Sequence, residues 1–267
     1  MNRKSIGVFD SGVGGLTVLK EILKALPHEG IVYLGDTARV PYGIRSREMV
    51  TRYSFDNTDF LLTKGIKLLT IACNTASSVS LEAIRKRLPI PVIGVVGPGA
   101  KAAVSATRNG RIGVIGTEAT IRSSAYMEKI KEIDGSVEVF GLPCPLFVSL
   151  AEEGFTDDDI ALMVARRYLE DLRGRGIDTL VLGCTHYPLL KGVISKVMGA
   201  SVTLIDSAVE TANEVKETLK SLEIQNVSEE EPLRVYYVTD SPERFVRIGE
   251  RFLGQRILQI EKISVGL

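Results

Sequence analysis

Two cysteines in similar settings are the residues of this sequence best suited to chemistry. Each follows a short apolar run and begins a polar turn, Cys73-Asn74-Thr75 in one case and Cys184-Thr185-His186 in the other. A thiol near a helix N-terminus can have its pKa lowered toward neutrality, which makes the thiolate available as a base. Two such groups on opposite faces of one carbon atom suit inversion of a stereocentre, because one removes a proton and the other delivers one.

Other roles for these cysteines remain as alternatives. A buried cysteine ordinarily behaves as a small hydrophobic side chain. Zinc could use Cys184 and His186, but no Cys-x-x-Cys or His-x3–5-His spacing completes a tetrahedral set, so we expect no metal. A dithiol redox site also lacks its Cys-x-x-Cys motif. The third cysteine, Cys144, lies between two prolines and is expected to pack in the core.

A glycine-rich segment from Asp10 to Gly15 opens the first helical pattern. Its glycines let backbone N–H groups approach a ligand, and the helix N-terminus favours an anion. Thr17 stands where a dinucleotide fingerprint requires glycine, and no Lys-Ser/Thr pair of a phosphate loop follows. The segment therefore favours a small anion over NAD or ATP, or else it is a tight turn capped by Asp10. Asp10 and His186 are the candidates that would tune the two thiols.

Short apolar runs alternate with helical patterns along the chain, which predicts an α/β fold built from βαβ units. A helix is expected over 15–26, and Pro27 closes it. Most of the expected strands are continuously apolar, as in a parallel sheet buried on both faces. They cover 5–10, 31–35, 67–72, 91–96, 111–116, 137–141, 178–183, 202–205, 233–238 and 257–261.

The candidate residues share one position relative to these strands. In open parallel sheets, ligands bind beyond the carboxyl ends of the strands. The segments expected at such ends are Asp10-Ser11, Asp36, Cys73-Asn74-Thr75, Thr117 and Cys184-Thr185-His186. Glu152, beside Glu153, is expected at a solvated helix end, with a functional role as the alternative.

The chain also contains an internal repeat. Residues 6–11 resemble residues 112–117, and residues 71–75 resemble residues 182–186, at offsets of 106 and 111 residues. These similar offsets predict two α/β halves related by a pseudo-twofold axis, with both thiols in the cleft between them. The last 60 or so residues would form a third piece or return to complete the first sheet.

Composition narrows the class of protein. The chain has 267 residues and equal numbers of basic and acidic side chains, 33 each, which argues against nucleic acid as the main partner. No apolar run approaches the roughly 20 residues of a membrane span, and the first residues do not form a signal peptide. Three cysteines form no disulfide framework, so we expect a reduced, cytoplasmic location.

Taken together, the motifs resemble the cofactor-independent aspartate/glutamate racemase family, and within it the glutamate racemases that supply D-glutamate for bacterial cell walls. The resemblance weakens from about residue 215 onward. The matching segments are Phe9 to Thr17, Gly35-Asp36-Thr37, Pro41-Tyr42-Gly43, Ala72 to Ala76, Gly116 to Thr120, Cys144-Pro145-Leu146 with Glu152, and Gly183 to Pro188.

This resemblance implies a role for each matched residue. Cys73 and Cys184 would be the two catalytic bases, and Asp10, Glu152 and His186 would assist them. The implied substrate contacts are Asp10, Ser11, Asp36, Tyr42, Gly43, Asn74, Thr75, Thr117, Thr185 and His186. No cofactor or metal is implied. His186 favours glutamate as substrate, because related aspartate racemases usually carry glutamate at that position.

The resemblance also implies how the chain is organised. One α/β domain would combine residues 1–97 with residues 208–267, and the second would cover residues 98–207. The protein would be a homodimer. Two alternatives remain: a racemase of aspartate or another acidic amino acid, and a non-catalytic amino-acid-binding protein on the same scaffold.

Overall fold

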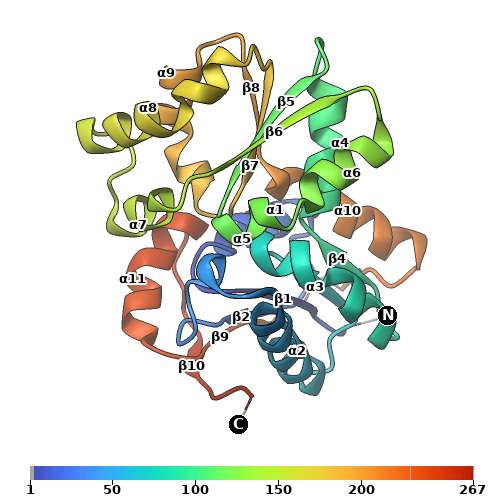
Figure 1. Cartoon of the computed structure of the whole chain (residues 1–267). Helices are drawn as coiled ribbons and strands as arrows, with labels where there is room; N and C mark the ends of the chain where they lie inside the picture. The colour runs from blue at the N-terminus through green and yellow to red at the C-terminus, as the bar shows by residue number, and fades with distance from the viewer. Residues whose placement is uncertain (1–2, 229, 267) are drawn as a thin grey trace.

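The computed structural model describes residues 3–228 and 230–266 and contains two parallel β-sheets (Figure 1). Sheet A has the strand order β10-β9-β2-β1-β3-β4, and sheet B has the order β6-β5-β7-β8. All ten expected strands are present. Their bounds are β1 Ile6–Asp10, β2 Ile31–Gly35, β3 Leu68–Ile71, β4 Val92–Gly94, β5 Arg111–Gly116, β6 Glu138–Pro143, β7 Thr179–Gly183, β8 Thr203–Ile205, β9 Arg234–Val238 and β10 Ile260–Lys262.

Helices cover both faces of sheet A, as continuously apolar strands require. Along β1, Ile6 and Val8 belong to the core on one face, whereas Phe9 belongs to the core on the other. The first face packs against α1 (Leu16–Ala25), α10 (Ser207–Ser221) and α11 (Pro242–Leu253). The second face packs against α2 (Arg47–Thr63) and α3 (Asn74–Arg87), and a short 3-10 helix, η1 (Tyr42–Ile44), lies before α2.

Sheet B is covered in the same way. Ile115 and Leu182 face α7 (Leu146–Glu153), α8 (Asp159–Gly174) and α9 (Lys191–Met198). Val114 and Val181 face α4 (Val96–Ala106) and α6 (Ala125–Ile133). Two short helices, α5 (Glu118–Arg122) and η2 (Tyr187–Leu190), follow β5 and β7. The protein therefore consists of two parallel-sheet α/β domains, as expected.

The two sheets share a common strand order. In sheet A the sequence β2-β1-β3-β4 corresponds to β6-β5-β7-β8 in sheet B. The repeated motifs thus occupy equivalent places: β1 and β5 are the matching strands, and Cys73 and Cys184 follow the matching strands β3 and β7. This agreement supports the internal repeat inferred from the sequence.

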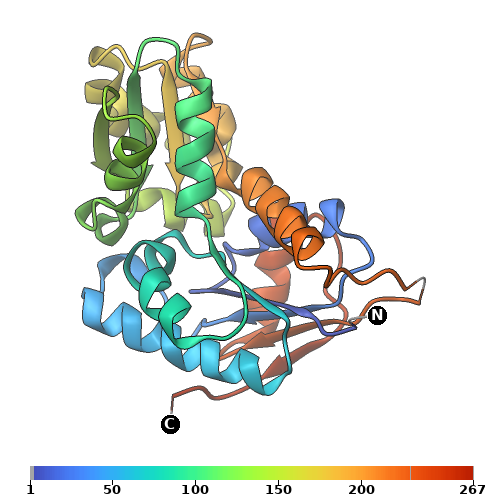
Figure 2. The same cartoon turned by 90° about the vertical axis from the view of Figure 1, so that its right-hand side faces the viewer.

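The C-terminal segment returns to the first sheet. β9 pairs in parallel with β2, and β10 pairs with β9, which extends sheet A beyond the repeated unit. The chain passes between domains through α4, which packs on sheet B, and α10, which packs on sheet A (Figure 2). These contacts support the proposed division into 1–97 with 208–267, and 98–207.

The segment that follows α10 covers the end of sheet A at which its strands begin. Lys67 forms a buried ion pair with Glu29, with an N–O distance of 2.6 Å, and also donates to the carbonyl of Ile224 at 2.7 Å. Glu29 in turn accepts a hydrogen bond from the backbone of Asn226 at 2.7 Å. The buried pair therefore ties the returning segment to the base of the sheet.

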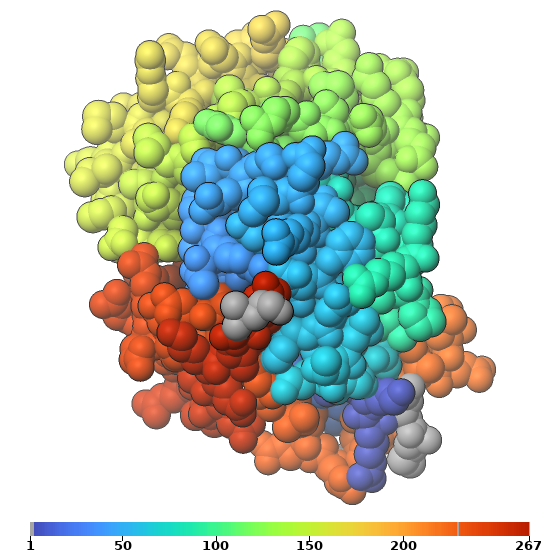
Figure 3. Space-filling model, turned by 60° about the horizontal axis from the view of Figure 1, so that its bottom comes forward, coloured from blue at the N-terminus to red at the C-terminus, as the bar shows by residue number. Residues whose placement is uncertain are grey.

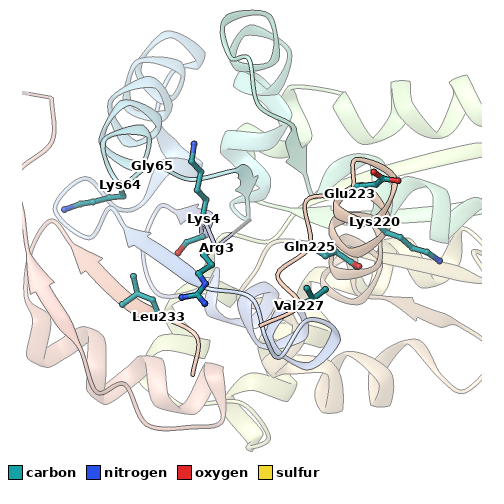
Figure 4. A pocket seen from close by; sticks show the side chains of 10 residues that line it. Arg3, Lys4, Lys64, Gly65, Lys220, Glu223, Gln225, Val227 and Leu233 are labelled. Carbon is teal, nitrogen blue, oxygen red and sulfur yellow. The ribbon is translucent and has the colours of Figure 1, made fainter. Parts of the chain in front are cut away.

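A hollow of about 1110 Å³ opens at this same end of the sheet (Figure 4). Its lining includes Ser5, Gly65 and Leu233, which precede β1, β3 and β9. Two of its lysines, Lys64 and Lys220, extend away from each other. It lies at the opposite end of the strands from the candidate catalytic residues, so we do not place the active site there. Within residues 3–228 and 230–266, no helix is both long and apolar enough to cross a membrane.

Candidate active site

Cys73 lies at the carboxyl end of β3, immediately before α3 begins. The residue is only 5% exposed, and its thiol donates a hydrogen bond to the Ser11 hydroxyl at 3.6 Å. Burial, and secondly the nearby Asp10 carboxylate, raise the pKa of Cys73 to about 12. The thiol is therefore neutral at neutral pH in this structure. We call Cys73 with Ser11 the Cys73 side of the site.

Asp10 ends β1 and is fully buried. Its carboxylate accepts hydrogen bonds from the backbone N–H of Gly12 at 2.9 Å and from the hydroxyl of Thr185 at 3.5 Å. Burial raises the pKa of Asp10, although the charge of His186 and these hydrogen bonds act against the rise. Gly15 lies so close to this carboxylate that a Cβ atom there would be 2.4 Å from the Asp10 Cβ. The glycine-rich segment is thus needed to pack around Asp10.

Cys184 follows β7 and has a different set of partners. Its sulfur lies 3.8 Å from Nδ1 of His186, and Nε2 of His186 lies 3.2 Å from Oε1 of Glu152. Burial alone would lower the pKa of His186, but Cys184 and Glu152 together raise it to about 10. The imidazole is therefore protonated at neutral pH. We call Cys184, His186 and Glu152 the Cys184 side.

Glu152 lies near the C-terminal end of α7, is largely covered, and has charged side chains as neighbours. Its side chain is 18% exposed and contacts both His186 and the guanidinium of Arg244, the latter at 3.2 Å. Burial raises its pKa, but His186 and Arg244 outweigh burial and lower the pKa overall. The expectation of a solvated helix end was therefore wrong for Glu152, because helix α11 from the other domain covers it.

The two sides meet at the glycine-rich segment. A Cβ atom on Gly14 would lie 2.3 Å from Oγ1 of Thr185 and 2.6 Å from the ring of His186, so only glycine fits there without a shift. The hydroxyl of Thr17 donates to the carbonyl of Thr185 at 3.1 Å. Segments after β1, β3 and β7 therefore converge, which places both thiols between the two domains.

Other expected substrate contacts gather beside the thiols and also join the domains. Asn74 accepts a hydrogen bond from the Tyr126 hydroxyl at 2.6 Å. The hydroxyls of Thr75 and Thr117 are 2.9 Å apart, and Thr120 is within 3.1 Å of both. A Cβ on Gly43 would be 2.6 Å from the Cβ of Thr117. The three threonine hydroxyls form one hydrogen-bonded cluster that joins the two domains.

Asp36 and Tyr42 contact each other through a short hydrogen bond from the tyrosine hydroxyl. The Asp36 carboxylate also binds Arg39 at 2.6 Å and accepts from Thr239 at 3.0 Å, and Tyr42 accepts from Asn57 at 3.0 Å. Both side chains are thus engaged within the first domain. A direct substrate contact by Asp36 stays a prediction.

Several residues of this site were missed from the sequence. Arg244, Arg251 and Phe252 lie on α11, where nothing in the local pattern separates them from surface or core residues of an amphipathic helix. Tyr126 and Thr17 are likewise ordinary members of helices. The signal that could have found them is spatial, because each contacts a predicted residue from the other domain.

Cys144 is buried in the same core as Cys184. Its thiol lies 3.8 Å from the Leu142 carbonyl, its own carbonyl accepts from the Tyr187 hydroxyl at 2.8 Å, and burial raises its pKa. These contacts agree with the expected packing role. Among the described residues, no three His, Cys, Asp or Glu side chains are arranged to hold a metal ion.

The space around the site is largely filled. A cavity of about 90 Å³ lies between the glycine-rich segment and α11, and Gly12, Glu152 and Arg244 are among its lining residues. Figure 3 shows the blue segment around η1 and the start of α2, and the orange-red region that contains α11, against the green and yellow second domain. The two thiols are thus shielded from solvent, since Cys73 and Cys184 are 5% and 6% exposed.

Comparisons with known proteins agree with this geometry. The model of the Asp/Glu/Hydantoin racemase family matches residues 6–215. The chain is 57% identical to the glutamate racemase of Geobacter metallireducens over 98% of this chain and 97% of that protein. It superposes on a Bacillus anthracis glutamate racemase with a TM-score of 0.95 and 42% identity, covering 99% and 98% of the two chains.

A second solved structure is a glutamate racemase from Francisella tularensis in complex with D-glutamate. It gives a TM-score of 0.94 at 38% identity, and the match covers 99% of this chain and 98% of that one. The family model, the full-length identity and the two superpositions agree with one another. The chain belongs to the glutamate racemase family.

Proposed function

We propose that this protein interconverts L- and D-glutamate by proton transfer at Cα between two thiols, Cys73 and Cys184. The observation that carries the proposal is the pair of buried thiols at the ends of equivalent strands. Cys73 contacts Ser11 of the glycine-rich segment, and Gly14 of the same segment packs against the two residues that follow Cys184. Their partners differ chemically, a hydroxyl and a carboxylate on one side and an imidazole on the other.

The reaction needs one thiolate and one thiol at the start. The thiolate accepts the α-proton of one enantiomer, and the electron pair left on Cα is delocalised into the α-carboxylate. The opposite thiol then donates its proton to the other face of Cα and becomes the thiolate. Atoms and charge balance without any other reactant, and the enzyme ends with its proton on the other sulfur, ready for the reverse reaction.

The surroundings suggest how each substrate group is held. Asp10, a buried carboxylate, can accept hydrogen bonds from the α-ammonium group, and Ser11 lies beside it. The backbone N–H groups of Asn74 and Thr75, at the start of α3, can bind the α-carboxylate and stabilise the charge that develops on it. We place Tyr42, Gly43, Thr117 and Thr185 around the rest of the substrate.

The product suggests the biological role. D-glutamate is a precursor of bacterial cell-wall peptidoglycan, so we propose that the enzyme supplies that synthesis and works in the cytoplasm as a homodimer. Supporting this placement, its cysteines are all unpaired, as in a reducing compartment.

Incubation with L-glutamate in D₂O, without added cofactor, tests the proposal. We expect D-glutamate to form and deuterium to enter at Cα of the product. Chiral chromatography with mass spectrometry measures both. Absence of both from folded, reduced protein would overturn the proposal. Parallel incubations with L-aspartate test the substrate, and tight glutamate binding without turnover would indicate a binding protein.

A further inference from the structure

Helix α11 of the first domain contacts the Cys184 side from outside the reacting groups. Figure 1 shows α11 next to α7, the helix that carries Glu152. The Arg244 guanidinium lies 3.2 Å from Oε2 of Glu152, while Oε1 of the same carboxylate faces His186. The two oxygens of Glu152 are therefore divided between an arginine and the imidazole.

Two further contacts connect α11 to Glu152 and His186. The guanidinium of Arg251 donates to the backbone carbonyl of Glu152 at 2.6 Å, which holds the end of α7. The ring of Phe252 packs edge-on against His186 with the ring centres 5.5 Å apart. One helix thus holds the backbone of Glu152, its carboxylate and the imidazole that the carboxylate contacts.

We propose that Arg244 is a positioning residue for the Cys184 side: it fixes the Glu152 carboxylate, which orients His186 next to Cys184. Arg244 touches none of the groups that exchange a proton with substrate, so it acts through Glu152. This inference rests on the proposed two-thiol reaction and adds to it a contribution from the C-terminal segment, where no motif matched.

The charged neighbours of His186, Glu152 and Arg244 determine which side chains would move when Arg244 is replaced. His186 faces Cys184, Glu152 and, more distantly, Asp10. Glu152 faces His186 and Arg244, and Arg244 also lies 3.5 Å from Glu153, an exposed residue. Removal of the guanidinium leaves Glu152 with one cationic partner, so its carboxylate can rotate away from His186.

The test uses Arg244→Gln, with Arg247→Gln as the matched control. Arg247 is exposed on the same helix and makes none of these contacts. We expect Arg244→Gln to lower kcat/KM about tenfold, because a displaced Glu152 carboxylate leaves His186 less well oriented beside Cys184. Arg244→Lys, which keeps the charge, should recover part of the loss, and Arg247→Gln should behave like the parent enzyme.

An isotope effect separates positioning from general loosening of the fold. Enantiomers have equal free energy, so kcat/KM must fall equally in both directions and cannot report which side is damaged. The α-deuterium isotope effect on kcat/KM does report which side is damaged. If the Cys184 step becomes slower, the isotope effect rises for the enantiomer that gives its proton to Cys184 and falls for the other.

The direction of this change has two internal references. His186→Asn damages the Cys184 side and should shift the isotope effects in the same sense as Arg244→Gln, whereas Ser11→Ala damages the Cys73 side and should shift them in the opposite sense. Unchanged isotope effects in Arg244→Gln, or a shift matching Ser11→Ala, would overturn the inference. If the parent enzyme itself does not exchange the α-proton, the proposed function fails instead.

Discussion

The Cys73 side and the Cys184 side occupy equivalent positions in two sheets of the same strand order, yet their chemistry differs. Cys73 has a hydroxyl and a buried carboxylate as neighbours, and the carboxylate disfavours a second negative charge. Cys184 has a protonated imidazole as its neighbour, with its sulfur 3.8 Å from Nδ1 of His186. The repeat thus supplies two matched positions, and the local residues place a negative charge beside one thiol and a positive charge beside the other.

This difference teaches that symmetry of the fold need not extend to the charges beside the two thiols. A racemase must accept both enantiomers, so the proton has to be able to reside on either sulfur. A substrate ammonium group beside Asp10 would offset the negative charge that raises the pKa of Cys73. We infer that a bound ammonium group makes the charges around the two thiols more alike than they are in the free protein.

Replacement of either thiol should give the largest effect. We expect Cys73→Ser and Cys184→Ser each to lower racemisation by roughly 10³-fold or more, because each removes one of two obligatory proton carriers. Formation of D-glutamate from L-glutamate measures the loss. Substantial activity in either variant would show that one side suffices and that the two-thiol reaction is wrong.

The assisting groups should rank next. We expect His186→Asn to cost roughly 10²-fold in kcat/KM, whereas Ser11→Ala should cost only about 2- to 10-fold, the equivalent of one neutral hydrogen bond. The reason is that His186 contributes a charge and Ser11 does not. Steady-state kinetics in both directions compare them. Equal losses would mean that the two sides are more alike than their contacts indicate.

The stability of the protein should depend on pH through the Cys184 side. The pKa of His186 is raised from 6.5 to about 10, so its stabilising contribution is complete below about pH 6.5 and disappears as the pH rises through 10. We expect the parent protein to lose on the order of a few kcal/mol across this window, measured by urea unfolding at several pH values.

His186→Asn provides the control for that measurement, because it lacks the titrating group. Its stability should fall less between pH 6.5 and 10 than that of the parent protein. Glu152, with a lowered pKa, contributes in the opposite range: its stabilisation is present above its unfolded value and is lost as the pH falls through the folded value. A parallel decline in both proteins would contradict the imidazolium assignment.

The third cysteine should give the smallest effect. Cys144→Ala removes a buried sulfur from the core that Cys184 shares, so we expect a stability loss of about 1 kcal/mol and nearly unchanged kcat. Thermal melting and racemisation assays measure these separately. A large fall in kcat without loss of stability would give Cys144 a role at the Cys184 side that its contacts do not indicate.

Much of the fold followed from local pattern. Continuous apolar runs identified most of the strands, because buried parallel strands carry little else. Polar residues at the ends of five strands marked the end of the sheets where the candidate site lies. The last strand was the least well placed: it begins at Ile260, where 257 was expected, since β10 is a short edge strand with two exposed residues.

The site was predictable only where chemistry and strand ends coincide. Cys73, Cys184 and Asp10 stood out because each is a chemically reactive or charged residue at the carboxyl end of an apolar strand. Glu152 looked like a surface residue because its cover comes from α11, about 90 residues further along the chain. Arg244 could not be predicted for the same reason, because a contact between distant segments does not alter the local residue spacing of either segment.

The pairing of β9 with β2 imposes an order of events on a chain that is still being made. β2 ends at Gly35 and β9 begins at Arg234, so about 200 residues separate these neighbours. At roughly 5–20 residues per second, the ribosome needs some tens of seconds to deliver the partner strand. Throughout that interval the outer edge of β2 has no strand beside it, and all of sheet B is made before β9 emerges. We therefore expect this edge to expose the nascent chain to aggregation until β9 has left the ribosome.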